Sequence, residues 1–368
     1  MNTTNARSPF IVTIPYSANA LNTESYVSFT GAYGSQSVGA GTEVIFTKPN
    51  TGTMIWNMSN LIREFILLKW VSLPSVPVLS DNSEISYFTI KRGYSQSGVI
   101  QTPLTNVDYI GLDGHNNYSE FNINLGITGY KLLTNTINKS YWGGGVPPFF
   151  EVLTDEFTCD KVSIYYTQTL PTSIQISRFL YPIKNQIVKI PYTLSAFNAN
   201  FKGAVSAIVE FDLDMAQTGT FTFTSTPIEE CKHIVYTLAY INRLGGWDFF
   251  TFYKASRLSM SVTNSNFQVS PIFDANGLID GSEPQFKTYN TNGKRKIKVN
   301  TDWIDEERNS EIEDLMLSER MLLRESNGGF TPVNIVTNSI EFKKSVNQKM
   351  INYELEFEYA YNVIDDVV

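Results

Sequence analysis

Apolar and polar residues alternate along much of the chain with the period of two that is typical of β-strands. The clearest run is 351–361, where Ile, Tyr, Leu, Phe, Tyr and Tyr alternate with Asn, three Glu and Ala. A strand with this pattern turns an apolar face to the core and an acidic face to solvent or to a partner. A second alternating run covers 205–213. Shorter strands are predicted at 162–166, 219–224, 234–241 and 249–253.

Two segments have the apolar spacing of helices instead. Near 59–67, Ser59 is placed to cap a short amphipathic helix with apolar residues on one face. The second helix is predicted from about 302 to about 324, with Asp302 as its cap. Acidic residues follow Asp302 and two arginines come near residue 324, a polarity that complements the helix dipole.

Asn292-Gly293 lies between two extended arms at 286–299, which predicts a β-hairpin with its turn at this pair. Helical crossovers between the strands are mostly missing, so we expect antiparallel pairing. The predicted fold is mainly β with a minor helical part, in two antiparallel β-sandwich-like or barrel-like domains. Residues 1–175 would form the first domain, with the short helix, and 176–368 the second, with the hairpin and the longer helix.

The composition supports a sheet-rich protein. Of 368 residues, 42% are hydrophobic and 13% are aromatic, and aromatic side chains suit the half-buried surface of a sheet. The length is too great for one ordinary domain and fits two or three. A net charge of -8 argues against specific nucleic-acid binding, which would need a strong local basic patch.

The sequence contains no recognisable targeting or membrane-spanning segment. Its first residues lack a basic stretch followed by an apolar run, and no apolar run approaches the roughly 20 residues that cross a bilayer. We therefore expect synthesis in the cytoplasm and no membrane insertion. In a reducing cytosol, Cys159 and Cys231 are expected to be reduced and buried.

Groups suited to catalysis are scarce. His115 lies in a Gly- and Asn-rich loop, where we expect a solvated residue rather than a general base. His233 shares a strand face with Cys231, but a Cys-His nucleophile pair needs a hydrogen-bond geometry that adjacency in sequence rarely supplies. The protein is accordingly expected not to be an enzyme. A glycosidase with two carboxylates about 5 to 9.5 Å apart stays an open alternative.

No motif predicts a cofactor or a metal ion. Gly143-Gly144-Gly145 lacks the Lys-Ser/Thr that completes a phosphate-binding loop, so a turn is the better interpretation. Asp212 and Asp214 could offer oxygens to calcium, although an outward strand face explains them without a ligand.

Positive charge concentrates at 294–298, Lys-Arg-Lys-Ile-Lys. Lysines on an edge strand discourage unwanted pairing, which is the simplest interpretation of this run. The alternative is a contact with DNA or with an acidic segment of a neighbouring copy. Trp247 and Trp303 are expected to anchor the core. The residues expected at contacts between subunits are Lys294, Arg295, Lys296, Asp302, Trp303, Asp305 and Glu306.

A turn motif is predicted at 240–248, Tyr-Ile-Asn-Arg-Leu-Gly-Gly-Trp-Asp. Gly245-Gly246 permits a tight reversal with φ > 0 that would join the strands at 234–241 and 249–253. The residues assigned to this motif are Asn242, Gly245, Gly246, Trp247 and Asp248.

These stretches together resemble a known family. Residues 240–248, the segment 299–304 before the acidic helix, the strand at 332–335 and the final alternating strand are similar to tail and neck proteins of Bacteroidetes phages, including the crAss-like phages. The opening segments 8–11 and 60–66 resemble the same family. The likeness covers the C-terminal half well and residues 65–181 poorly.

The resemblance implies a virion protein of the phage tail, made in the cytoplasm of the bacterial host. Such a subunit would form a homo-oligomeric ring or collar of six or twelve copies around the DNA channel, stacked on neighbouring tail or portal-proximal proteins. The family brings no catalytic residues and no cofactor. An acidic channel wall would repel the phosphates of the passing genome. The alternative function is a carbohydrate-binding or receptor-binding adhesin module of the tail.

Overall fold

The computed structural model divides the chain into two units that are each built from three separate segments. Unit 1 comprises Met1–Glu229, Ala239–Thr251 and Glu307–Glu319, and unit 2 comprises Glu230–Leu238, Phe252–Glu306 and Arg320–Val368. The structure describes residues 2–16, 24–33, 42–67, 78–79, 84–97, 99–101, 105–116, 125–126, 130–135, 139–142, 149–154, 161–169, 172–179, 186–191, 205–213, 216–227, 232–273, 276–279, 281–282, 284–324, 328–342 and 350–364.

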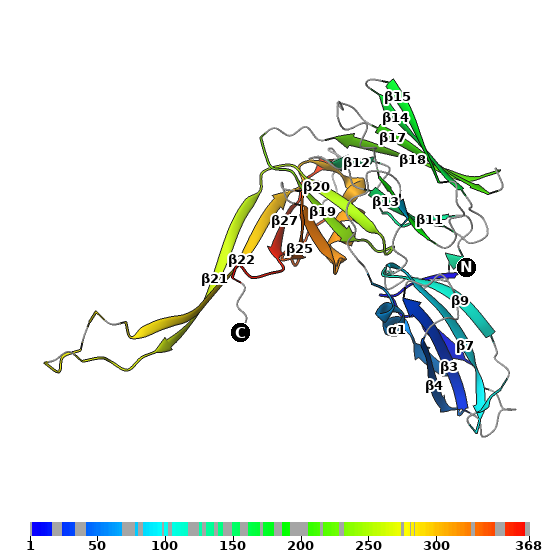
Figure 1. The fold of residues 1–368 in the computed structure, drawn as a ribbon, viewed down its shortest axis with the longest axis horizontal. Coiled ribbons are helices and arrows are strands. Elements are labelled where there is room, and N and C mark those ends of the chain that lie inside the picture. Colours follow the sequence, from blue (N-terminus) through cyan, green and yellow to red (C-terminus); the bar gives the residue numbers. More distant parts are fainter. Residues whose placement is uncertain are drawn as a thin grey trace. The chain divides into compact units, whose positions relative to one another are not determined.

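The prediction of a mainly β protein with a minor helical part is confirmed (Figure 1). Most strand pairs are antiparallel, and none of the described sheets closes into a barrel. Two neighbouring pairs are parallel, β1 (Asn2–Asn5) with β9 (Thr105–Leu112) and β12 (Lys139–Trp142) with β18 (Ala216–Pro227). The predicted domain boundary at 175 and 176 lies inside a strand, so the two units do not follow it.

Unit 1 contains a large sheet with the strand order β10-β1-β9-β7-β3-β4, and β8 pairs with β7 outside this path. Its two faces pack into different cores because successive side chains of a strand point to opposite sides. Phe29, Phe88 and Tyr109 belong to one core, and Tyr87 and Ile110 belong to the other. The remaining strands of this sheet are β3 (Glu24–Tyr33), β4 (Thr42–Pro49), β7 (Ser86–Gln96), β8 (Val99–Ile100) and β10 (Leu125–Gly126).

The first core is covered by a two-stranded sheet of β2 (Ile11–Ile14) and β5 (Met54–Asn57) together with helix α1. The second core joins the large sheet to a smaller one, through Leu153 and Ile187. That sheet has the order β11-β13-β16-β6. Two sheets therefore pack face to face in unit 1, as in a sandwich. The smaller sheet consists of β6 (Val78–Leu79), β11 (Tyr130–Leu132), β13 (Phe149–Thr154) and β16 (Ile187–Pro191).

Helix α1 (Ser59–Glu64) lies where the first helix was predicted, but Ser59 is not its cap. The side-chain oxygen of Asn57 instead accepts a hydrogen bond from the backbone N–H of Ser59, at 3.1 Å. The same oxygen accepts the N–H of Phe10. The side-chain amide of Asn57 therefore holds both the start of α1 and the residue just before β2. Ile62 packs on Gly111, where a Cβ would lie only 2.5 Å from the Ile62 methyl.

The third sheet of unit 1 has the order β12-β18-β17-β14-β15. Strands were predicted at 162–166, 205–213 and 219–224, and they are present as parts of β14 (Lys161–Thr169), β17 (Val205–Leu213) and β18. Strand β15 (Thr172–Phe179) pairs with β14 along its whole length.

Strands β19 (Tyr236–Ile241) and β20 (Trp247–Phe252) are neighbours, and their residues are all buried. They were predicted at 234–241 and 249–253, close to these bounds. The chain passes from unit 2 into unit 1 within β19 and returns at the end of β20.

The predicted helix at 302–324 is wrong over more than half of its length. Strand β23 (Ile304–Asp305) and a 3-10 turn (Glu306–Arg308) come first, and α3 covers only Asn309–Leu317. Asp302 has φ of 60°, so it lies outside any helix, and Ser318 is already extended. Residues 321–324 form β24 (Met321–Arg324), in which buried and half-buried side chains alternate as they do in a strand.

In unit 2, consecutive neighbours in the sheet are β24, β25 (Phe330–Ile335), β27 (Glu354–Tyr359), β22 (Phe286–Asn300) and β21 (Arg257–Gln268). The predicted alternation is confirmed in β27, where Leu355, Phe357 and Tyr359 are buried and the three glutamates face outward or are half-buried. Strand β26 (Met350–Ile351) pairs with β23.

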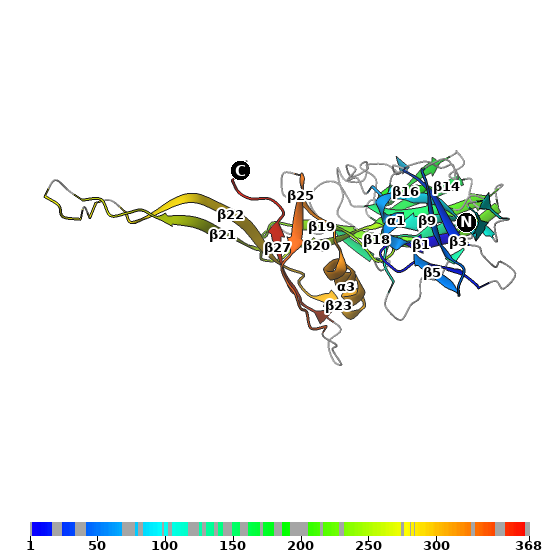
Figure 2. The same ribbon diagram turned by 90° about the horizontal axis from the view of Figure 1, so that it is seen from below.

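The predicted hairpin at 286–299 is wrong, because β22 runs unbroken through Asn292-Gly293 and pairs with β21. The two strands form a long ribbon that projects from the rest of the unit 2 sheet (Figures 1 and 2). Asn292 and Gly293 bind the C-terminal segment instead. The Gly293 carbonyl accepts the N–H of Val363, and the Asn292 side chain exchanges two hydrogen bonds with the backbone of Ile364.

Phe88 tests the larger core of unit 1, since it is fully buried and stacks on Phe29 and Tyr109. Phe88→Ala should lower the free energy of unfolding by about 3 to 5 kcal/mol, because it removes buried surface and leaves a cavity. Urea unfolding followed by circular dichroism measures the change. Ile45→Ala, at an exposed position of the same sheet, is the control, and equal losses in the two variants would contradict this assignment of the core.

Candidate functional site

The predicted reversal at Gly245-Gly246 is present, with Gly245 at φ +86°. Asn242 organises this turn from a fully buried position. Its side-chain oxygen accepts the backbone N–H of Leu244 at 2.9 Å and that of Gly246 at 3.2 Å. Its backbone N–H donates to the Gly246 carbonyl at 3.0 Å. An Asn is required here because the same side chain must both accept and donate.

The donor side of Asn242 binds a different part of unit 1. Its Nδ2 donates to the Leu133 carbonyl and to Asp248 Oδ2, both at 2.7 Å. The Asp248 carboxyl also accepts the Thr134 hydroxyl and the backbone N–H of Asn135. We call Thr134, Asn135, Asn242, Asp248 and Asp314 the polar node.

Asp314 links helix α3 to the polar node. Its Oδ2 accepts the Asn135 side-chain amide at 2.9 Å and the backbone N–H of Arg243 at 3.4 Å. At the start of α3, the Arg308 guanidinium donates two hydrogen bonds to the buried Glu311 carboxylate, at 2.9 and 2.7 Å. Helix α3 is therefore held by hydrogen bonds at its first turn and on its inner face. The polar node thus connects the helix to the rest of unit 1.

Burial raises the pKa of the Asp248 carboxyl to about 7, although the donors of Thr134, Asn135 and Asn242 act in the opposite direction. A perturbed carboxyl is a feature of many active sites. Here, however, the side chain is 1% exposed and its hydrogen-bond acceptors are occupied by protein donors. A substrate could not reach it, so the polar node holds the fold together.

A second buried charge cluster lies next to Trp247, which is buried as predicted. The Lys189 ammonium lies 2.7 Å from Glu84 and 3.4 Å from Glu151, and all three side chains are at most 2% exposed. Glu151 Oε2 accepts the backbone N–H of Trp247 at 2.9 Å. Burial raises the Glu151 pKa to about 8 despite the nearby lysine. The sequence showed no trace of this cluster because its members, one just before β7 and the others in β13 and β16, are far apart in the chain.

Glycines bring backbone segments together around the turn. A Cβ at Gly246 would lie 2.3 Å from the Leu133 carbonyl oxygen, and one at Gly114 would lie 2.4 Å from the Arg243 oxygen. The neighbouring His115 donates its backbone N–H to the same Arg243 carbonyl. We expected His115 to be solvated, but it is half-buried. Burial lowers its pKa, and the nearby positive charges of Arg7 and Arg243 lower it further.

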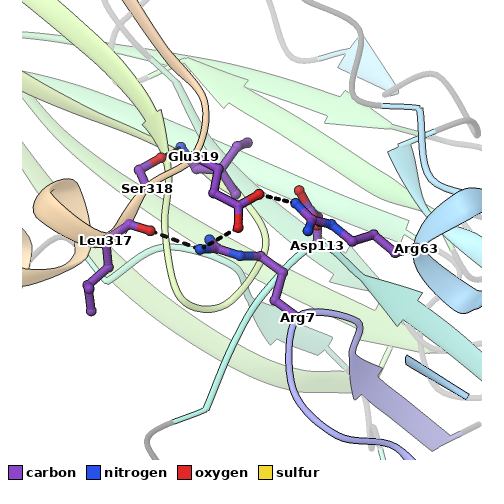
Figure 3. Close-up of polar contacts among 7 residues, drawn as sticks. Arg7, Arg63, Asp113, Leu317, Ser318 and Glu319 are labelled. Atoms are coloured by element: carbon purple, nitrogen blue, oxygen red, sulfur yellow. Dashed lines mark hydrogen bonds and ion pairs between the residues drawn. The ribbon is translucent and has the colours of Figure 1, made fainter. Parts of the chain in front are cut away.

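A polar cleft of about 330 Å³ opens beside this region, lined in part by Arg7, Arg63, His115 and Glu319. Figure 3 shows Glu319 between the two guanidinium groups. Arg63 also pairs with Asp113 at 3.1 Å, and Arg7 donates to the Leu317 carbonyl at 2.9 Å. The cleft therefore has its opposite charges already paired within the protein, and it offers no open charge for a ligand.

The lysines of the basic run are paired inside unit 2. Lys294 and Lys296 lie 2.9 and 3.7 Å from Glu358, and Lys298 lies 3.0 Å from Glu354. The acidic face of β27 thus meets the lysines of β22, a pairing that the separate sequence motifs did not predict. Arg295 lies on the other face of the ribbon, because it shares the side of Ile297.

The other expected contact residues have mixed surroundings. Asp302 lies 3.4 Å from Lys254, while Asp305 is exposed and Glu306 is half-buried. Trp303 is 55% exposed, so its predicted role as a core anchor is wrong. Its indole is instead exposed to solvent, and its place at a contact between subunits stays a prediction.

The most unusual surface belongs to the ribbon of β21 and β22, which we call the arm. Leu258, Met260 and Val262 share one face of β21, and they are 65%, 57% and 50% exposed. No charged residue occurs from 258 to 268. Sequence reasoning missed this surface because alternation predicts a strand with an apolar face but does not say what covers that face.

A groove of about 510 Å³ lies at the base of the arm. Apolar side chains from three strands and from the segment before β19 form most of its wall, and Arg295 adds one positive charge. The lining residues are Ile234, Tyr236, Leu258, Ser259, Met260, Arg295 and Tyr359. The groove and the arm are thus the surfaces of unit 2 that are suited to binding another protein.

Among the described residues, no three His, Cys, Asp or Glu side chains are placed to hold a metal ion together. Asp214, Cys159, Cys231 and the glycines 143–145 lie outside the part of the chain that the structure describes. None of the described helices is long and apolar enough to cross a membrane.

No family model and no curated protein matches this sequence. Among solved structures, the chain is similar to the calcium-binding domain CBD12 of CALX1.1, at 10% identity over 61% of this chain and 96% of that chain, with a TM-score of 0.19. CBD12 from CALX1.2 is 12% identical over 57% of this chain and 75% of that chain, with a TM-score of 0.17. TM-scores this low carry no argument about fold or function.

Gly246→Ala should destabilise the protein by about 1 to 3 kcal/mol, because the new methyl would overlap the Leu133 carbonyl and displace the turn. Thermal unfolding measures the effect. Gly52→Ala is the matched control, since no atom lies within 4 Å of a Cβ at that position. Equal melting temperatures for the two variants would show that the turn is not closely packed on residue 133.

The raised pKa of Asp248 predicts a pH dependence of stability. Between the ordinary carboxyl pKa of about 4 and the folded value of about 7, the native state holds a proton that the unfolded chain has lost, so stability falls as pH rises. Asp248→Asn removes the titrating group and therefore the loss of stability with rising pH. The side chain keeps its shape, and its NH2 group can donate a hydrogen bond to Thr134. The free energy of unfolding of the variant relative to wild type should therefore rise by up to about 1.4 kcal/mol per pH unit in this range.

Urea unfolding at pH 5, 6 and 7 gives the comparison. Glu151 contributes to both proteins in the same direction, so its effect cancels in the difference. Parallel pH profiles for the two proteins would contradict the raised pKa of Asp248.

Proposed function

We propose that this protein is a non-enzymatic structural subunit of an assembled particle, a ring, collar or hub of a phage tail that acts through contacts between subunits. The observation that carries the proposal is the arm, a long ribbon with an exposed apolar face and an outer strand that has no charge after Arg257. A surface of this kind is suited to burial against another protein.

The physical argument begins with the edge of the sheet. Strand β21 is the last strand of its sheet, so one side of its backbone has no neighbour in that sheet. Proteins that work alone protect such edges with charges, prolines or bulges. In the 12 residues of β21 the only charge is Arg257, at the very start, proline is absent, and the one bulge of its ladder lies at Ser265/Asn266, away from the apolar residues 258–262. This design favours association.

The buried carboxyls of unit 1 support a structural function. Asp248, Asp314, Glu151 and Glu311 accept hydrogen bonds from protein donors. A catalytic carboxyl must reach a substrate, whereas these groups join elements of the same unit. Their arrangement is that of a rigid building block.

The assignment to a phage tail rests on the resemblance carried by 240–248, 299–304 and 332–335 together with the final strand. The structure adds a physical meaning to the first stretch, because Asn242, Gly246 and Asp248 form the buried connection of the turn. The resemblance thus involves residues that determine the shape of the subunit. Repeated assembly requires that every subunit has the same shape.

An adhesin module of the tail is the second candidate, and one observation favours it. Phe267 and Tyr289 are both exposed on the arm, with ring centroids 5.9 Å apart. Exposed aromatic rings can also stack on sugars, so clear binding on a glycan array would favour this function over assembly.

Shortening the arm tests the assembly function. Ser265 and Asn290 are paired residues, so replacing 266–289 with Asn-Gly should close a two-residue turn on them. The shortened protein should keep its circular dichroism spectrum and melting temperature, because the removed residues that the structure describes are almost all exposed. It should lose self-association in light scattering and be missing from purified particles by mass spectrometry.

Ile45→Ser with Ile55→Ser is the matched control, since it removes two exposed apolar side chains outside the arm. The control should assemble like wild type. A wild-type protein that stays monomeric at high concentration and is not found in particles would overturn the proposal.

A further inference from the structure

The tip of the arm has an unusual surface of its own, which we define as residues 269–285. Phe273 and Ile279 form a β-bridge that closes the tip into a small loop. Even so, Phe273, Leu278 and Ile279 are 61%, 67% and 67% exposed. The tip also carries negative charge in its sequence, with Asp274, Asp280 and Glu283 and no basic residue. The tip therefore combines exposed apolar side chains with an acidic sequence.

The groove at the base of the arm has the opposite charge. Its wall is largely apolar, and among the described residues that line it Arg295 is the only charged one. The lysines on either side of Arg295 are paired with Glu358, but Arg295 makes no ion pair among the residues that the structure describes. An unpaired guanidinium beside apolar surface suits an acidic, apolar ligand.

The tip cannot reach the groove of its own chain. Met260 lines the groove, and the ladder between β21 and β22 continues unbroken from there to Gln268, apart from one bulge. These eight residue steps span roughly 26 Å at about 3.3 Å per residue. A ribbon paired along this length holds the tip away from the base (Figure 2).

We propose that the tip of one copy binds in the groove of a second copy, where its exposed apolar side chains meet the apolar wall and the negative charge of its sequence favours Arg295. This inference rests on the proposed assembly function and names the partner, the chain itself. Because the tip and the groove are different surfaces, the contact is heterologous, and its repetition closes a ring or extends a filament. Each copy would then give one arm and receive one.

Two variants separate the halves of the contact. The tip variant carries Phe273→Ser and Leu278→Ser, and the groove variant carries Met260→Ser and Arg295→Glu. All four positions are exposed, so both variants should fold. Each variant alone should associate at least about tenfold more weakly than wild type, since truncation of central interface residues commonly costs this much or more.

Mixing the two variants gives the decisive result. The tip variant has an intact groove and the groove variant has an intact tip, so an equal mixture should form a dimer of one copy of each and grow no further. Light scattering coupled to size exclusion measures the mass. Wild type and the Ile45→Ser, Ile55→Ser control should form larger assemblies under the same conditions.

The outcomes separate the two proposals. If wild type assembles and the groove variant assembles equally well, the tip-to-groove contact is wrong while the assembly function stands. A mixture that contains only monomers, or a tip variant that still dimerises alone, also overturns the inference. If wild type itself neither associates nor enters particles, the proposed function fails as well.

Discussion

A buried amide and a buried carboxyl hold unit 1 together. Asn242 and Asp248 lie in the turn and strand at 242–252, and they bind the segment 133–135, which in turn binds Asp314 of α3. Polar groups removed from water cost free energy unless they are hydrogen-bonded. These three segments must therefore keep one mutual position, which the glycines at 114, 245 and 246 allow by bringing backbone against backbone.

The same constraint explains why buried carboxyls of unit 1 have raised pKa values while they accept hydrogen bonds from protein donors. Burial raises the pKa of both Asp248 and Glu151, and catalytic sites use the same effect. What separates the two cases is access. Asp248 accepts from three side-chain or backbone donors, and Glu151 accepts the N–H of Trp247 beside Lys189. Such groups give a fold a single arrangement at some cost in stability.

The sequence predicted the fold where one residue pattern had one interpretation. Strands β17 and β27 followed from alternation, and the reversal at Gly245 followed from its glycine pair. Prediction failed where a local signal competed with a distant partner. Asn292-Gly293 has the composition of a turn, yet it lies within β22 because β21 and the C-terminal segment supply its hydrogen bonds. The acidic start and basic end at 302–324 suggested one helix, although Met321 and Leu323 are buried in a strand.

The arm shows what periodicity cannot reveal. An alternating strand has the same sequence whether its apolar face is covered by its own chain or by another, so the pattern alone does not reveal that Leu258, Met260 and Val262 are exposed. The charges at the base of the arm also bear on its orientation. Because Lys294 and Lys298 are paired with Glu358 and Glu354, the base is fastened to β27 and the direction of the arm is set by its own unit. A projecting arm with a fixed direction can reach a neighbour in one orientation only, and this is the geometric condition for a regular assembly.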